Sequence, residues 1–109
     1  MANTFKLKTK ANVGVSTVGI YTAPAATTTV VIGITMANTS GPCVNVGVGI
    51  TRAGTTEDVK LLKNAPIPQG SSLEFMAGNK IVLEATDTVT VDSDTNNSVD
   101  AALTIMEIT

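Results

Sequence analysis

The feature that most constrains this chain is a two-residue alternation of β-branched and polar side chains. Thr, Val and Ile together make up 39 of the 109 residues. Branching at Cβ restricts the side-chain rotamers and suits a pleated, half-buried surface better than a helix. No segment repeats its apolar residues with the 3.6-residue period of a helix. The sequence therefore predicts an all-β protein.

Two runs carry the alternation most clearly. In residues 27–37 it predicts a strand with one inward set, Val30, Ile32, Ile34 and Met36, and with Thr29 facing outward. In residues 44–51 it predicts a strand with inward Val44, Val46, Val48 and Ile50, and with Asn45 and Thr51 outward. The intervening NTSGP makes the pair a hairpin.

Further period-2 runs cover residues 59–64, 72–76, 80–84, 87–92 and 98–108, with shorter candidates at 4–8 and 17–22. About eight strands with short connections describe one small antiparallel β-sandwich, of jelly-roll or immunoglobulin-like type. We expect residues 13–109 to form this domain and residues 1–12 to extend from it as an arm. The aliphatic core is thin for 109 residues, and oligomerisation would compensate for that shortage.

The composition excludes several classes of function. The chain has no His, no Trp and one Cys, so imidazole catalysis, His-ligated metals and disulfide frameworks are absent. No residue pattern suggests catalysis, a cofactor, a structural metal or a small-molecule substrate. A sequence pI near 4.8 with one Arg gives no phosphate footprint, so we expect no nucleic-acid partner. No signal peptide or membrane span is evident, and Cys43 fits synthesis in a reducing cytoplasm.

Charge is unevenly distributed along the chain. Residues 1–63 carry a net charge of +4 and residues 64–109 a net charge of −6. In one folded domain this asymmetry can have no consequence, because strands from both halves interleave. In an assembly, it would help a basic segment dock on the acidic face of a neighbour.

One loop has the composition of a weak calcium site. Asp92, Asp94, Asn96 and Asp100 lie at spacings similar to those of an oxygen-ligand loop. Asn97 stands where that loop needs Gly, and Leu103 stands where it needs a bidentate Glu. We therefore interpret the segment as a solvated turn, with ion binding left open.

The candidate functional residues are interface residues rather than catalytic ones. Gly47 and Gly49, at alternate outward positions of one strand, predict a bare strip that another chain could approach. A local twist or bulge explains the two glycines about as well. The arm alternates apolar anchors with positive charge, and the last strand shifts its apolar residues to the other face, which suggests a bulge or a packed edge. These two segments contribute Phe5, Lys6, Leu7, Lys8, Lys10, Met106 and Ile108.

An ordered series of motifs resembles a known family. The series is IYTAP (20–24), TTTVVIGITMAN (27–38), APIPQGSSL (65–73), GNKIVLEATDTVTV (78–91) and SVDAALTIMEI (98–108). It is similar to the small β-sandwich virion structural proteins of tailed bacteriophages, particularly marine and cyanobacterial phages, over residues 12–109. Thr86 and Asp87 stand where the family has Gly-Asp, a change confined to a turn.

The resemblance implies a non-enzymatic virion part, made in the bacterial cytoplasm. A capsid decoration, or cement, protein bound to the major capsid shell is the favoured hypothesis, because a basic arm suits docking on acidic subunits. A neck, baseplate or tail-fibre component is the close alternative. A carbohydrate-binding or adhesin module, with Tyr21 as its aromatic, is the alternative from another class. The expected partners are copies of the chain, other virion proteins, or both.

Overall fold

The computed structural model describes residues 3–52, 58–75 and 80–109. Within these ranges the chain forms strands and no helix. The strands are β1 (Asn3–Val13), β2 (Val18–Thr22), β3 (Thr28–Asn38), β4 (Val44–Thr51), β5 (Asp58–Ile67), β6 (Ser72–Phe75), β7 (Ile81–Leu83), β8 (Thr88–Ser93) and β9 (Val99–Ile108). The described part therefore holds no helix that could cross a membrane.

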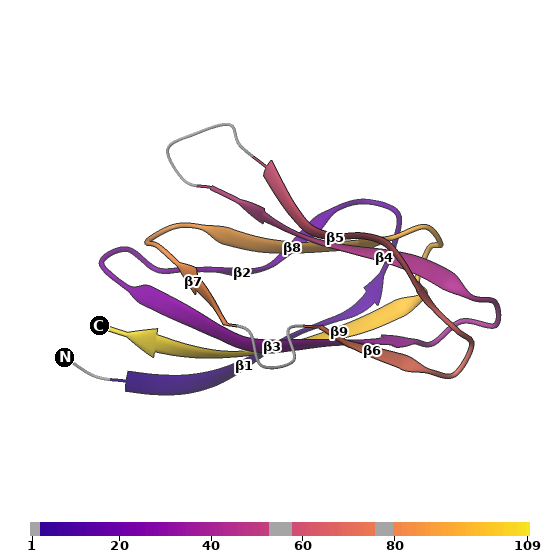
Figure 1. Ribbon diagram of the computed structural model, residues 1–109, viewed down its shortest axis with the longest axis horizontal. Coiled ribbons are helices and arrows are strands. Elements are labelled where there is room, and N and C mark those ends of the chain that lie inside the picture. The colour runs from indigo at the N-terminus through magenta and orange to yellow at the C-terminus, as the bar shows by residue number, and fades with distance from the viewer. Residues whose placement is uncertain (1–2, 53–57, 76–79) are drawn as a thin grey trace.

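The strands form two antiparallel sheets that pack face to face (Figure 1). Sheet A has the order β1-β9-β3, and both short strands β6 and β7 pair with the far side of β3. Sheet B has the order β2-β8-β4-β5. Because β3 and β4 lie in different sheets, the predicted hairpin between them is wrong, and their connection crosses from one sheet to the other. The expected all-β sandwich is confirmed, with nine strands instead of about eight.

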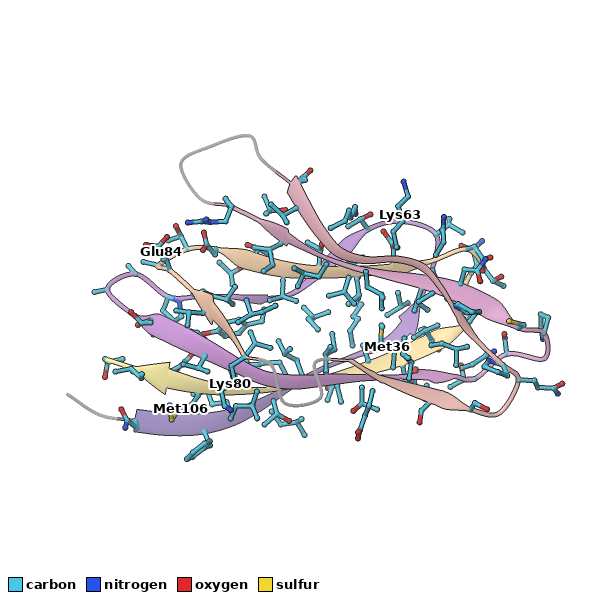
Figure 2. All side chains as sticks on the ribbon, viewed as in Figure 1. Met36, Lys63, Lys80, Glu84 and Met106 are labelled. Carbon is cyan, nitrogen blue, oxygen red and sulfur yellow. The ribbon has the colours of Figure 1, made fainter. Side chains whose placement is uncertain are left out.

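Strand β4 follows its predicted alternation. Val44, Val46, Val48 and Ile50 are buried between the sheets, while Thr51 is exposed and Asn45 is half-buried. From the other side, Ile34, Met36, Leu103 and Ile105 of sheet A complete the core. Figure 2 shows Met36 between the two layers. The predicted inward face of this strand is therefore correct.

Strand β3 departs from the prediction at a β-bulge. Its pairing with β9 shifts between Val31 and Gly33, so that Ile32 is an extra residue. Before the bulge, Thr29 and Val31 are buried, whereas Val30 and Ile32 are only half-buried. The predicted inward positions of Val30 and Ile32 and the outward position of Thr29 are wrong, because one inserted residue reverses the faces.

Strand β9 shows no bulge in its own alternation. Val99, Ala101, Leu103, Ile105 and Glu107 are buried, and Met106 and Ile108 face the outer side. Glu107 is the only polar residue among these inward positions of β9. The change of apolar face at Met106 thus comes from a buried carboxylate and not from an irregular strand.

The segment expected to extend as an arm lies in sheet A. Residues 3–10 pair with β9 in continuous register, from Asn3 opposite Ile108 to Lys10 opposite Ala101. All of these residues are exposed except half-buried Lys8. Val13 anchors the strand, since its side chain is buried and its carbonyl accepts a hydrogen bond from Ser98 N at 3.0 Å. The segment therefore contributes backbone pairing and little core.

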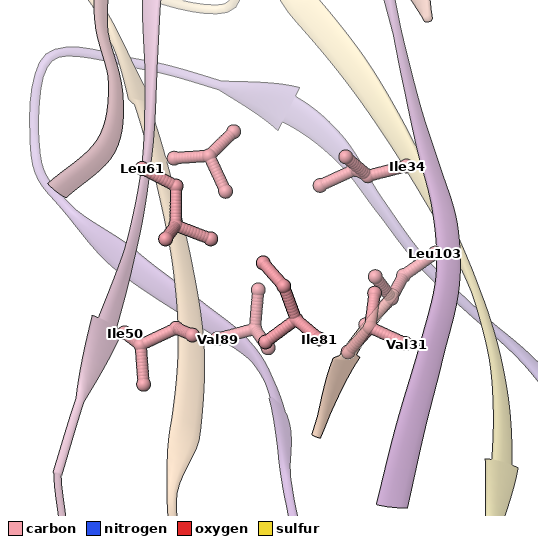
Figure 3. Close-up of a pocket in the computed structure, with 8 residues that line it drawn as sticks. Val31, Ile34, Ile50, Leu61, Ile81, Val89 and Leu103 are labelled. Carbon is pink, nitrogen blue, oxygen red and sulfur yellow. The ribbon is translucent and has the colours of Figure 1, made fainter. Parts of the chain in front are cut away.

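A small apolar void remains between the sheets. It has a volume of about 10 Å³ and is lined by aliphatic side chains of both sheets, among them Val31, Leu61 and Leu103. Figure 3 shows these side chains pointing toward one another across the gap. A void of this size with an apolar lining holds at most one water and offers it no hydrogen-bond partner. It is a packing defect and not a ligand site.

Candidate interaction surface

Strand β1 leaves one long edge of sheet A open. β9 pairs with one side of β1, and no strand in the described part of the chain pairs with its other side. Alternate backbone N–H and C=O groups of an edge strand point outward and can pair with another chain. At eleven residues, β1 offers such groups over a long stretch.

The two faces of β1 differ in chemistry. Residues that pair across antiparallel strands share a face, so Lys6, opposite buried Ile105, and Lys8, opposite buried Leu103, lie on the inner side. The Lys6 side chain is 42% exposed, and Lys8 is half-buried. Phe5, opposite Met106, and Leu7 lie on the outer side and are 69% and 64% exposed. One strand thus presents positive charge to one side and apolar surface to the other.

The outer face of sheet A carries a continuous apolar row. The register places Phe5 beside Met106, Met106 beside Val30, and Val30 beside Val82. Val82 is 59% exposed, and Figure 2 shows Met106 on the outer side of this sheet. We call the following set the outer patch: Phe5, Leu7, Val30, Ile32, Val82, Met106 and Ile108. None of its members packs against the core cluster, and contiguous apolar surface of this kind marks interaction sites.

A buried polar network holds β1 against the body of the sandwich. Tyr21 Oη donates a hydrogen bond to Glu107 Oε2 at 2.6 Å and lies 2.7 Å from Thr29 Oγ1. Lys6 Nζ lies 2.9 Å from the other oxygen of Glu107. The Tyr21 hydrogen bond, followed by that from Lys6, lowers the pKa of Glu107, while burial raises the pKa of Tyr21 to about 12. Glu107 therefore stays ionised and joins β1, β2 and β3.

We expect acid to weaken this network. The folded-state pKa of Glu107 is lowered, so its contribution is present above the unfolded-state pKa of about 4.3 and is lost as pH falls through the folded-state value. Glu107→Gln should reduce the free energy of unfolding at pH 7 by about 1–2 kcal/mol. Thermal melts between pH 7 and pH 2 should also show a smaller loss of stability for the variant than for the wild type.

The control is Glu74→Gln, which makes the same charge change at an exposed position on β6. At pH 7 it should leave the melting temperature unchanged. Equal acid sensitivity of the wild type and Glu107→Gln would contradict the role assigned to this carboxylate.

Gly47 and Gly49 lie elsewhere, in β4 of sheet B, and both are buried. A Cβ on Gly47 would lie 2.6 Å from Asp92 Oδ1, and one on Gly49 would lie 2.9 Å from the Val59 carbonyl oxygen. The Lys60–Asp92 ion pair, at 3.7 Å, crosses the same face. The expected bare strip is covered by the chain itself, so the predicted interface at these glycines is not supported.

Gly49→Ala is expected to lower the free energy of unfolding by about 1–3 kcal/mol, as overpacking typically does. The added methyl would press on backbone, which cannot turn aside as a side chain can. Gly33→Ala in β3 is the matched control, because no atom of the described residues lies within 4 Å of its added Cβ. Urea unfolding of both variants gives the comparison. Equal stabilities would show that β5 does not cover Gly49 closely.

The carboxylates of the 92–100 loop bind different partners within the chain. Asp92 accepts from Thr17 Oγ1 at 2.9 Å, Asp94 from Asn45 N at 3.1 Å, and Asp100 from Asn12 N at 3.0 Å. In the described ranges, no three His, Cys, Asp or Glu residues form a group that could hold a metal ion. These hydrogen bonds fix the loop to β4 and to the N-terminal segment.

A groove of about 220 Å³ lies beside the outer patch, between β5 and β7. Ile50, Val59 and Leu83 are among the residues that line it. Near it Arg52 forms ion pairs with Glu84 and with Asp87, the latter at 3.1 Å. These pairs link the end of β4 to the turn after β7.

The structure brings seven of the nine predicted interface residues together. Phe5, Leu7, Met106 and Ile108 form part of the outer patch, and Lys6, Lys8 and Lys10 line the adjoining edge. Val30, Ile32 and Val82 also belong to the outer patch and were not predicted from the sequence. Adjacent apolar residues in VVI and IVL were the available signal, because apolar side chains on both faces of a strand indicate that both faces need cover.

No protein-family model matches the sequence, and no curated protein matches it. The similar structures described below show the fold alone, because their sequence identities are 14% or lower. A chain of the disulfide-linked pili that form Bacillus endospore appendages superimposes with a TM-score of 0.61 and 14% identity. The match covers 99% of this chain and 87% of that one.

Two viral structures share the same sandwich. A chain of the acidic stable capsid of Helicobacter pylori bacteriophage KHP30 gives a TM-score of 0.57 at 8% identity, covering 100% of this chain and 94% of that one. A chain of the infectious bursal disease virus T13 particle gives 0.59 at 14% identity. There the match covers 96% of this chain but only 30% of the viral one, so the sandwich is a segment of a longer protein.

Proposed function

We propose that this protein is a non-enzymatic virion structural protein of a tailed bacteriophage. More specifically, we propose that it is a decoration protein that attaches to the capsid shell. The observation that carries it is the outer patch, exposed apolar surface that continues onto the open, basic edge of β1. A surface of this kind fits an assembly partner better than a small ligand.

The fold supports the same proposal. The matched chain of the KHP30 capsid is nearly the same length as this one, so a single sandwich of this size serves as a whole chain in a phage capsid. The motifs that resemble tailed-phage virion proteins extend over most of the sequence. Neck, baseplate and fibre positions use the same kinds of contact and are separate outcomes of the experiment below.

The carbohydrate-binding alternative loses its aromatic platform. Tyr21, on which it depended, is 7% exposed and hydrogen-bonded to Glu107 inside the sandwich. Sugar rings stack on exposed aromatic faces, which this residue does not offer.

Attachment to particles tests the proposal. Virions assembled without the protein should capture it in co-sedimentation, and electron microscopy should show the added density on the capsid shell. Lys8→Glu with Lys10→Glu changes only edge side chains and should weaken capture, and rising salt should weaken wild-type capture. Density on the neck, baseplate or fibres would support a virion role but overturn decoration. Absence of capture would overturn both.

A further inference from the structure

We propose that the open edge of β1 accepts an extended segment of a partner protein in which acidic and apolar residues alternate. The segment adds to sheet A as a new edge strand. This inference rests on the proposed function and specifies the chemistry of the partner at the attachment surface.

The backbone of β1 is open to pairing along one side. β1 is the outermost strand of sheet A, and its side away from β9 is unpaired in the described part of the chain. Its pairing with β9 continues without a shift from Asn3 to Lys10, so the exposed edge is regular over the same length. A regular edge of this kind is the template for strand addition by another chain.

The two faces of β1 determine which side chains a pairing strand can carry. An added strand would place alternate side chains beside Phe5 and Leu7 on the outer side and beside the lysines on the inner side. Lys6 already pairs with Glu107 at 2.9 Å. Among the described residues no ion pair involves Lys8 or Lys10, so their charges are available. A complementary strand therefore carries apolar residues at one set of positions and carboxylates at the other.

The charges of β1 disfavour its antiparallel pairing with its own copy. β1 contains three lysines at alternate positions and no acidic residue. In an antiparallel pair of β1 strands that keeps the apolar faces together, lysine lies opposite lysine in every well-overlapped register. Like charges directly opposite each other destabilise a strand pair. Charge complementarity thus favours an acidic segment from a different protein.

Lysines on an edge strand have another known role, which is to prevent aggregation. That role does not account for Phe5 and Leu7, which are 69% and 64% exposed on the same strand. A strand that only needed protection would not expose large apolar side chains between its charges. The two roles make different predictions for the same lysine variant.

The experiment uses the full chain and a synthetic peptide in which three glutamates alternate with valines. Binding should shift the backbone amide NMR signals of residues 3–10, and a peptide with lysines in place of glutamates should not bind. Two further peptides carry N-methyl groups on alternate residues, in either phase. Because only one edge of an added strand faces β1, one isomer should lose binding and the other should retain it.

Lys8→Thr with Lys10→Thr should weaken peptide binding by about fivefold or more at low salt. Lys63→Thr with Lys80→Thr makes the same net charge change at exposed positions outside β1 and should have no effect. The inference is overturned if both N-methylated isomers bind equally, or if the amide shifts fall outside β1. It is also overturned if the Lys8 and Lys10 variant aggregates while its peptide affinity is unchanged, or if sedimentation shows that β1 mediates self-association.

Failure of the inference and failure of the proposed function are distinguishable. A chain that binds virions but not the peptide retains the function and loses the strand-addition mechanism. A chain that binds the peptide at β1 but not virions retains the mechanism and loses the function.

Discussion

Replacing Phe5 and Leu7 together with threonine is expected to lower the affinity for virions about 100-fold, while the fold stays intact. Both side chains lie on the outer side of β1 and contribute nothing to the core. Burying each in an interface contributes roughly 1.5 kcal/mol or more, and about 2.7 kcal/mol corresponds to a factor of 100 in affinity. Threonine keeps the strand propensity. Co-sedimentation at several protein concentrations measures the change.

Val15→Thr is the matched control for this pair. Val15 is 56% exposed and lies between β1 and β2, outside the outer patch. Its replacement should leave virion affinity within about twofold, because isolated exposed apolar residues are ordinary surface. An equal loss for Val15→Thr would show that general surface hydrophobicity drives attachment. Unchanged affinity in the Phe5 and Leu7 variant would remove the outer patch from the interface.

Leu103→Ala is expected to cost about 2–5 kcal/mol of unfolding free energy, the usual range for large-to-small changes in a core. Leu103 is fully buried at the centre of β9 and lines the apolar void between the sheets (Figure 3). Deleting its branched end enlarges a void that is already present, and the surrounding strands are held in register by their ladders. Urea unfolding monitored by circular dichroism gives the value.

Thr104→Ala provides the comparison on the same strand. Thr104 is exposed on the outer side of sheet A, so its replacement should cost less than about 1 kcal/mol, the span of strand propensities. Similar losses for the two variants would contradict the assignment of inner and outer faces in β9.

Much of the fold could be predicted because a two-residue period leaves little choice of face. Strand β4 pairs with β8 without a register shift, so the alternation correctly predicts which of its side chains are buried. In β3 the same reasoning fails, because the extra residue at Ile32 reverses the faces of the residues before it. Thr29 is therefore buried, with Tyr21 Oη 2.7 Å from its hydroxyl, and Tyr21 in turn binds Glu107. Tyr21 and Glu107 belong to β2 and β9, and no local pattern in the sequence of β3 indicates these contacts.

The interaction surface could be predicted in part. The alternation of lysines with Phe5 and Leu7 and the outward Met106 gave most of its residues. The register across three strands, which places Met106 beside Val30 and Val30 beside Val82, could not be obtained from the sequence. The prediction of a bare strip at Gly47 and Gly49 failed for a related reason. Bulges in the pairing of β4 with β5 determine which residues cover these glycines.

The central claim is that the protein attaches to virions through β1 and the outer face of sheet A. Amide hydrogen exchange on the free and the virion-bound protein tests this most directly, because exchange reports the pairing of each backbone N–H. We predict slower exchange on binding in residues 3–10, with little change in β5 at the edge of sheet B. Slower exchange in β5 with β1 unchanged would contradict the claim.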